Sequence, residues 1–573
     1  MRPSLPRAPS GTAAGAKRAE LRVLTPLAST ASARSVPEPG RVHPRRVAEL
    51  AAVGSLLLLA VALRVRGLPG GGPVAYDEGW AAANGRFLIA LITHPARWGG
   101  ALHQRLRVFP YGYDGKVGHD LMLGTVQAVG VSPSNLTWYS ALAGIVMVIA
   151  LAALAWRRWG APAAAVSGVF AGTIPLGIVY GHRIVAEADG LAAVALALFL
   201  LDRWWDARPS KLLTIVTLGA FLAALSLSYR FLPTLLPILL VLGWLGWWYA
   251  GHRMPPTAPV GRLVTLCLVP ALALVSLYLL IPAGTGLGLH PPAALQRWFI
   301  HASAGAPLPF AFPDFYFRTF WDFGGPAILV AAGLGTMAAA WSWKRLEPLA
   351  ALALGSLWGT LLFFTAVHDK APRAIVIAIP FAGLLVARAV TLWTARSRQW
   401  AVGLAVCAAC LYTGWAGSSA AREVSGTGEA GRWLAAHPGA IVATRTPVLA
   451  LYIRPQWDAP QGLDRAHQFV RSRQDSTIGS LRQEGARWVV VDAHALLLGA
   501  SPVFTQLLAC GRPAVEFRDA AGWSRLQFLE EADTLHLDYD AVLAVRAHLL
   551  ATAQGVETLR IYDLEGTGTA GCQ

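Results

Sequence analysis

Charged residues are scarce in this chain. Only 14% of its 573 residues are Asp, Glu, Lys or Arg, whereas 55% are hydrophobic. Soluble domains carry roughly 25% charge, so the composition excludes an ordinary soluble protein. Apolar runs of about 18 to 20 residues recur along the chain, and each is long enough to cross a hydrocarbon core about 30 Å thick. The sequence therefore predicts a polytopic α-helical membrane protein.

Cysteine is scarce as well, with five residues in the whole chain. Cys407 and Cys410 form a C-x-x-C pattern inside an apolar stretch that lacks a βαβ context, which argues against a redox site. Cys510 and Cys572 are the two cysteines of the polar C-terminal part. If that part lies in an oxidising compartment, a disulfide between them is expected, with two free thiols as the alternative.

Acidic residues are outnumbered, and the formal net charge is +16. The excess Arg and Lys lie mostly in short loops between apolar runs, where basic residues set the orientation of membrane spans. We therefore expect no nucleic-acid partner. The cluster Arg41–Arg46 precedes the first span and predicts a cytoplasmic N-terminus in a multi-pass protein of the plasma (inner) membrane. Residues 1–44 are expected to form a disordered basic segment.

Basic clusters alternate with polar loops of another character, which predicts about eleven crossings. The transmembrane domain is expected to cover residues 45–417, with outer-face loops at 68–120 and 282–323. Within the first loop, Glu78–Leu91 is expected to form an interfacial helix and Val117–Val131 a short or re-entrant one. The expected spans are Val47–Leu63, Leu136–Ala155, Ala163–Val179, Leu191–Leu201, Leu212–Leu227, Phe231–Tyr249, Leu263–Ile281, Gly325–Ala340, Leu352–Val367, Ala374–Leu392 and Trp400–Ala416.

The last part of the chain, residues 418–573, is not apolar enough to cross a membrane. Three short runs rich in β-branched residues predict strands at Ala440–Thr444, Trp488–Asp492 and Leu559–Asp563. Gly431–His437 is expected to form a helix before the first strand, and further helical patterns lie between the strands. The sequence predicts an extracytoplasmic α/β domain here.

An acidic pair, Asp77–Glu78, follows the first span. Adjacent carboxylates beside a bilayer repel each other and need water, a cation or a function. The structural alternative is an acidic pair at a helix N-terminus, stabilised by the helix dipole. We expect the pair to be functional.

The outer ends of the expected spans collect further polar groups. Carboxylates and cations that face one leaflet suit a phosphate-bearing lipid, since cations bind phosphate and a carboxylate deprotonates a hydroxyl nucleophile. The alternatives are an interfacial salt-bridge cluster for the groups near Asp189, and arginines that reach toward lipid headgroups. The collected groups are Asp77, Glu78, His182, Arg183, Glu187, Asp189, Arg230, His368, Asp369, Lys370 and Arg373.

His103, His119 and Asp120 are candidate metal ligands. No second pair with ligand spacing accompanies them, so the sequence does not predict a structural metal site. The metal requirement stays open, and a divalent cation is the one cofactor under consideration.

Four short motifs, taken in order, resemble the membrane-embedded GT-C glycosyltransferases. Asp77–Glu78 matches their acidic pair after the first span, and Tyr180–Gly190 resembles the second outer-loop motif of the protein O-mannosyltransferase-like branch. Tyr229–Pro233 takes the place of a basic residue that opens a later span, and Ala371–Pro380 is similar to a Pro-Arg segment followed by an apolar span. The likeness, strongest to lipid A aminoarabinose transferases and Rhizobium-type lipopolysaccharide sugar transferases, covers about residues 45–400.

The resemblance implies an inverting hexosyl or pentosyl transferase that uses a polyprenyl-phosphate sugar on the extracytoplasmic face. The acceptor would be a lipid, a glycan or a protein. Asp77 would be the catalytic carboxylate, with Glu78 beside it. The implied donor-phosphate contacts are Arg183, Arg230, Lys370 and Arg373, and the implied pocket residues are His182, Glu187 and Asp189.

A secondary transporter or lipid flippase is the alternative function. Transporters place charged groups near the bilayer midplane and are often built from internal repeats. Here the centres of the expected spans are nearly free of charged residues, and no half of the chain is duplicated. The sequence therefore favours the enzyme.

Overall fold

The computed structural model describes residues 44–68, 72–93, 116–206, 211–231, 234, 312–341, 347–367, 370–453, 469–499, 501–569 and 571–572. The chain divides into two compact units, Met1–Glu49 and Leu50–Gln573. The described end of the first unit begins helix α1 (Pro44–Val65) and holds an ion pair between Arg45 Nε and Glu49 Oε1 at 3.2 Å. Everything below concerns the second unit.

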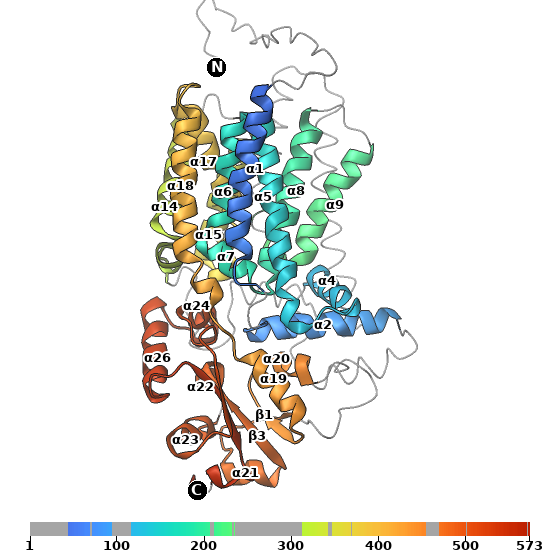
Figure 1. Ribbon diagram of the computed structural model, residues 1–573, viewed down its shortest axis with the longest axis vertical. Helices are drawn as coiled ribbons and strands as arrows, with labels where there is room; N and C mark the ends of the chain where they lie inside the picture. The colour runs from blue at the N-terminus through green and yellow to red at the C-terminus, as the bar shows by residue number, and fades with distance from the viewer. Residues whose placement is uncertain are drawn as a thin grey trace, which may run out of the picture. The chain divides into compact units, whose positions relative to one another are not determined.

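Long apolar helices pack side by side as a bundle (Figure 1). Its most extensive pairings join α5 to α6 and α8, α8 to α9, α17 to α6, α14 and α15, and α18 to α6. Small residues make the approach possible, for example Gly168 against Leu57 and Gly172 against Ala60. The helices are α5 (Thr137–Trp159), α6 (Ala161–Thr173), α7 (Pro175–Gly181), α8 (Ala186–Asp206), α9 (Lys211–Leu227), α14 (Pro326–Trp341), α15 (Pro348–Ala366), α16 (Pro372–Val376), α17 (Ile379–Trp393) and α18 (Gln399–Gly417).

Five helices in the described part of the chain are long and apolar enough to cross a membrane, or six if α6 and α7 form one bent span. That pair bends by 60° before Pro175, because proline removes a backbone donor and keeps Ile174 out of the helical region. The prediction of a multi-pass membrane protein is confirmed. The expected spans Phe231–Tyr249 and Leu263–Ile281 lie largely outside the described residues. The total of about eleven crossings and the side of each terminus stay predictions.

Two helices lie across the end of the bundle: α2 (Tyr76–Thr93) and α4 (Val117–Ala128) (Figure 1). They are the helices expected at Glu78–Leu91 and Val117–Val131. They cross where Gly85 faces Gly124, so closely that a Cβ on either glycine would overlap the backbone of the other. A third glycine, Gly79, lets α2 approach the backbone of Val448 in the same way.

The C-terminal region, which we define as residues 418–573, folds around one five-stranded mixed sheet in the order β2-β1-β3-β5-β4. The strands β2, β1 and β3 are parallel, whereas β5 runs antiparallel to β3 and β4. The strands are β1 (Ala440–Val442), β2 (Phe469–Val470), β3 (Ala486–Val491), β4 (Val515–Arg518) and β5 (Thr558–Asp563).

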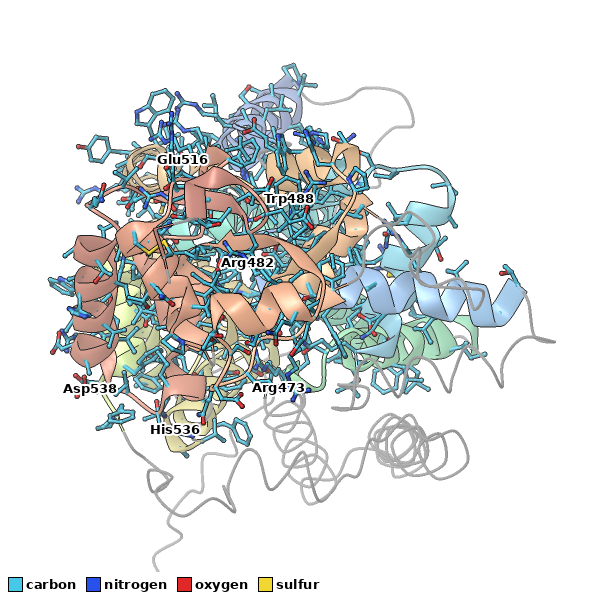
Figure 2. The ribbon with its side chains drawn as sticks, turned by 90° about the horizontal axis from the view of Figure 1, so that it is seen from below. Arg473, Arg482, Trp488, Glu516, His536 and Asp538 are labelled. Atoms are coloured by element: carbon cyan, nitrogen blue, oxygen red, sulfur yellow. A yellow bond between two sulfur atoms is a disulfide. The ribbon has the colours of Figure 1, made fainter. Side chains whose placement is uncertain are left out.

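Helices cover this sheet, and Figure 2 shows the region from below, with Arg482 on a helix, Trp488 on β3 and Glu516 on β4. The three predicted strands and the first predicted helix are confirmed. The sequence patterns missed β2 and β4, which are short strands at the two edges of the sheet. The helices are α19 (Thr427–Ala436), α20 (Thr446–Ile453), α21 (Ile478–Gln483), α22 (Ala493–Leu498), α23 (Val503–Cys510), α24 (Arg525–Glu530), α25 (Ala532–Leu535) and α26 (Tyr539–Thr552).

A disulfide joins Cys510, at the end of α23, to Cys572 in the tail, with the two Cα atoms 5.5 Å apart. Of the two alternatives that the sequence left open, the structure has the disulfide, and Figure 2 draws the bond in yellow. It ties the segment after β5 to the body of the region, since chain ends otherwise fray. Cys407 and Cys410 are free. The division into domains at residues 44 and 417 stays a prediction.

The crossing of α2 and α4 predicts that Gly124→Ala destabilises the protein. The added methyl would meet the carbonyl oxygen of Gly85, and such overpacking costs about 1–3 kcal/mol. The matched control is Gly219→Ala, because that helical glycine has nothing within 4 Å of a built Cβ. Thermal unfolding in detergent should show a lower midpoint for Gly124→Ala alone. Equal midpoints for the two variants would contradict the close crossing.

Candidate functional site

The two carboxylates of the acidic pair have different surroundings. Both lie in the first turn of α2, but the side chain of Asp77 keeps 44% of its surface exposed, whereas Glu78 is fully buried. The backbone N–H of Val74 donates to Glu78 Oε2 at 2.7 Å. Glu78 therefore has the role of a helix-terminal acid, and Asp77 is the member of the pair that another molecule can reach.

Arg373 binds Asp77. Its Nη1 atom lies 2.6 Å from Asp77 Oδ2, and its side chain is 12% exposed. Arg373 belongs to the short helix α16, which begins at Pro372 where a proline is well tolerated. Two motifs that are far apart in the sequence thus meet at one ion pair. The donor-phosphate contact that the resemblance implies for Arg373 stays a prediction.

Positive charges surround Asp77. Burial raises the pKa of Asp77, but the charges of Arg373, Lys116 and Arg230 outweigh burial and hold that pKa below its usual range. The carboxylate is therefore ionised at neutral pH. A partly exposed carboxylate among cations is able to accept a proton from a hydroxyl group while the cations stabilise a developing anion.

Lys116 is a member of this group that the sequence reasoning missed. It stands at the N-cap position of α4, is 8% exposed, and its charge acts on both Asp77 and Glu187. A buried lysine is rare unless it is paired, so its burial is informative. The available signal was the one lysine of the expected outer loop 68–120, directly before an apolar helix.

The motif between α7 and α8 contributes two further buried pairs. Arg230 Nη1 lies 3.1 Å from Glu187 Oε1, and His119 Nδ1 lies 2.7 Å from Asp189 Oδ2. Each pair joins α8 to another element, so the expected alternative of a local i,i+4 cluster does not describe them. Within the described part of the chain, no group of three or more His, Cys, Asp or Glu side chains is arranged to hold a metal ion. His103 lies outside that part.

His182 and Arg183 face the C-terminal region. The ring nitrogens of His182 lie 2.6 Å from the carbonyl oxygen of Arg64 and 3.1 Å from that of Ala421. Arg183 Nη1 donates to Gln527 Oε1 at 2.8 Å. These contacts place the motif at the junction between the bundle and the C-terminal region, and its substrate-binding role stays a prediction.

Lys370 lies at the end of α15. Its Nζ atom donates to the carbonyl oxygens of Phe364 at 3.0 Å and Thr365 at 2.6 Å, where a helix leaves acceptors without intrahelical partners. This contact stabilises the helix end. The predicted phosphate contact of Lys370 stays a prediction, and His368 and Asp369 lie outside the described residues.

The C-terminal region supplies an acid that the sequence reasoning also missed. Glu530, the last residue of α24, is 7% exposed, and its Oε2 atom lies 3.3 Å from Arg373 Nε. Its Oε1 atom accepts from the backbone N–H of Arg373 at 3.0 Å and from the hydroxyl of Tyr180. Nothing in the local sequence marks Glu530, because its partners lie in other parts of the chain.

Further ion pairs dock this region onto the bundle side. Arg318 of α13 (Phe315–Thr319) binds Asp540 of α26 through two nitrogens, at 2.7 and 2.5 Å. Asp322 of the π-helical turn η4 (Phe320–Gly324) accepts from Arg525 and from Tyr539, each at 2.8 Å. Most of these groups are exposed, so each contributes little alone. Together they contribute to the docking of the C-terminal region.

No family model matches the sequence, and no curated protein matches it. Solved structures do match. ArnT from Cupriavidus metallidurans in the apo state is 15% identical, with 79% of this chain and 94% of that chain covered and a TM-score of 0.50. The chain shares the fold of ArnT. The fold implied by the motif resemblance is thereby confirmed.

Two other solved structures are similar at slightly lower scores. ArnT bound to undecaprenyl phosphate is 17% identical, with the same coverage of 79% and 94% and a TM-score of 0.49. The archaeal oligosaccharyltransferase AglB from Archaeoglobus fulgidus, in complex with an inhibitory peptide and a dolichol-phosphate, is 9% identical, with 79% of this chain and 70% of that chain covered and a TM-score of 0.49.

Glu531 makes the stability of this junction depend on pH. Burial and nearby Asp77 raise the pKa of Glu531 to about 7. A raised carboxyl pKa favours the folded state below the unfolded value of about 4.5, and this contribution is lost as pH rises through 7. It amounts to up to about 3 kcal/mol.

We expect Glu531→Gln to remove this pH dependence. As the pH rises from 4.5 to 7.5, the unfolding midpoint of the wild type should fall relative to that of Glu531→Gln. Only the wild type has a carboxyl group here that the folded state favours in its protonated form and that loses its proton in this range. Glu565→Gln, at an exposed surface position, is the control. Wild-type and Glu531→Gln curves that stay parallel would rule out a raised pKa at Glu531.

Proposed function

We propose that the protein is a glycosyltransferase that moves a sugar from a polyprenyl phosphate to a hydroxyl group of a lipid, glycan or protein acceptor on the extracytoplasmic face. One observation carries the proposal: Asp77, 44% exposed and paired with Arg373, lies among buried cations at the end of an apolar bundle. The fold shared with ArnT supports it. The polyprenyl phosphate rests on the motif resemblance.

Asp77 has the charge state of a general base. In the proposed step Asp77 accepts the proton of the acceptor hydroxyl, and the acceptor oxygen attacks the anomeric carbon of the sugar. The bond between that carbon and the phosphate oxygen breaks, and its electron pair leaves with the polyprenyl phosphate. A single displacement of this kind inverts the anomeric centre. Arg373 keeps Asp77 ionised before the proton moves.

The departing phosphate needs positive side chains near Asp77 that do not bind the Asp77 carboxylate directly. In a direct displacement the leaving group lies on the far side of the anomeric carbon from the base, several ångströms from the carboxylate. Lys116 and Arg230 act on Asp77 by charge, whereas Arg373 binds it directly. We therefore propose Lys116 and Arg230 as donor-phosphate contacts. The motif resemblance adds Arg183, Lys370 and Arg373 as further candidates. Positive groups there would stabilise the charge that develops on the phosphate.

The first test is Asp77→Asn. An amide cannot accept the proton, so transfer should fall about 100- to 10,000-fold. Release of polyprenyl phosphate from a donor sugar by protein in nanodiscs measures this, with the exposed Asp475→Asn as the control. Glu78→Gln should cost less, because Glu78 is buried at the helix end.

Transfer by Asp77→Asn within about threefold of wild type would refute the assignment, since this lies far inside the expected range. Movement of the lipid across the bilayer without bond cleavage would support the transporter or flippase instead.

The second test concerns the donor. Lys116→Ala and Arg183→Ala should raise the KM for the lipid donor, because a charged hydrogen bond contributes about 1.5–3 kcal/mol, or about 10- to 100-fold. Arg525→Ala is the control, since Arg525 is half exposed and binds Asp322 instead. Donor kinetics equal to wild type in Lys116→Ala and Arg183→Ala would show that both residues only support the structure.

A further inference from the structure

We propose that Glu530 is a positioning residue: from the C-terminal region it holds Arg373 against Asp77, so that the membrane-side site is complete only when α24 is docked. The inference rests on the proposed function, because it concerns the same carboxylate. Glu530 would touch neither donor nor acceptor and would act through Arg373.

Arg373 is held at three points. Its Nη1 atom lies 2.6 Å from Asp77 Oδ2, its Nε atom lies 3.3 Å from Glu530 Oε2, and its backbone N–H donates to Glu530 Oε1 at 3.0 Å. The guanidinium thus lies between the carboxylate of Asp77 on α2 and the carboxyl group of Glu530 on α24. Because Glu530 also fixes the backbone of Arg373, movement of Glu530 would move the whole residue.

Glu530 is itself well fixed. The helix α24 begins after Ser524, whose side chain accepts from the backbone N–H of Gln527. Residues three apart lie on the same helix face, so Gln527 and Glu530 face the bundle together. Gln527 holds Arg183 and Glu530 holds Arg373, so one short helix positions two of the candidate arginines.

The surroundings of Glu530 favour its neutral form. Burial raises its pKa well above the usual range, and the negative charges of Glu531, Asp77 and Glu78 add to the effect. A neutral Glu530 still accepts hydrogen bonds at Oε1 but does not compete with Asp77 for the charge of Arg373. Glutamine has the same shape and no charge, so Glu530→Gln should preserve the arrangement.

A purely docking role for Glu530 makes different predictions. In that case Glu530→Ala would loosen the C-terminal region in the same way as any other broken contact at the junction. The pair between Arg318 and Asp540 is such a contact, and it lies outside the Asp77 cluster. Asp540→Asn is therefore the matched control for docking alone.

The experiment follows the protonation of Asp77 directly. Carbodiimide with an amine nucleophile labels protonated carboxyl groups, and peptide mapping of the full chain in nanodiscs gives the pH at which Asp77 is half labelled. For Glu530→Ala this pH should rise by about one unit, because Arg373 is no longer held against Asp77. Its kcat should fall about tenfold or more.

The companion variants complete the expected pattern. Glu530→Gln should stay within about threefold of wild-type kcat, with the labelling of Asp77 unchanged. Tyr180→Phe removes one donor to Glu530 and should shift the labelling in the same direction as Glu530→Ala, by less. Asp540→Asn should change neither quantity.

Two results would overturn the inference: wild-type labelling of Asp77 in Glu530→Ala, or an equal shift in Asp540→Asn. If Glu530→Ala does not fold, Tyr180→Phe gives the same decision, since wild-type labelling there also overturns it. Absence of transfer by the wild type would contradict the proposed function alone, and the labelling of Asp77 would still decide the role of Glu530.

Discussion

The ion pair between Asp77 and Arg373 is the interaction on which the rest of the site depends. Charges removed from water are costly unless they are paired, by several kcal/mol for each ion. The pair therefore needs its three supporting elements together: α2 with the acid, α16 with the arginine and α24 with Glu530. Close contact of Gly79 with Val448 fixes the first turn of α2 against the C-terminal region.

Polar groups gather at both ends of the apolar bundle. At the end away from Asp77, Asp202 binds Arg157 at 2.9 Å and also binds Arg158, in the last turns of α5 and α8. Arg388 of α17 places its Nη2 atom 3.0 Å from Oε1 of Glu347, the residue before α15. The pairs with Asp202 join the last turns of α5 and α8.

The different surroundings of Asp77 and Glu78 follow from helix geometry. Successive residues of a helix point in different directions, so one carboxylate of Asp77–Glu78 faces inward to the helix end and the other faces outward. The inward acid stabilises the start of α2, and the outward acid keeps exposed surface beside Arg373. The helix-terminal alternative thus describes Glu78, and the functional role of Asp77 stays a prediction.

The sequence alone determined the membrane class and the strands β1, β3 and β5, because these follow from composition and local periodicity. It left the pairing of Cys510 with Cys572 open, and it did not predict the contact between Asp77 and Arg373. Only the tertiary structure decided that Lys116 is buried near Asp77 and that Glu530 contacts Arg373. The physical reason is that burial and charge pairing depend on contacts between distant segments, which no local pattern encodes.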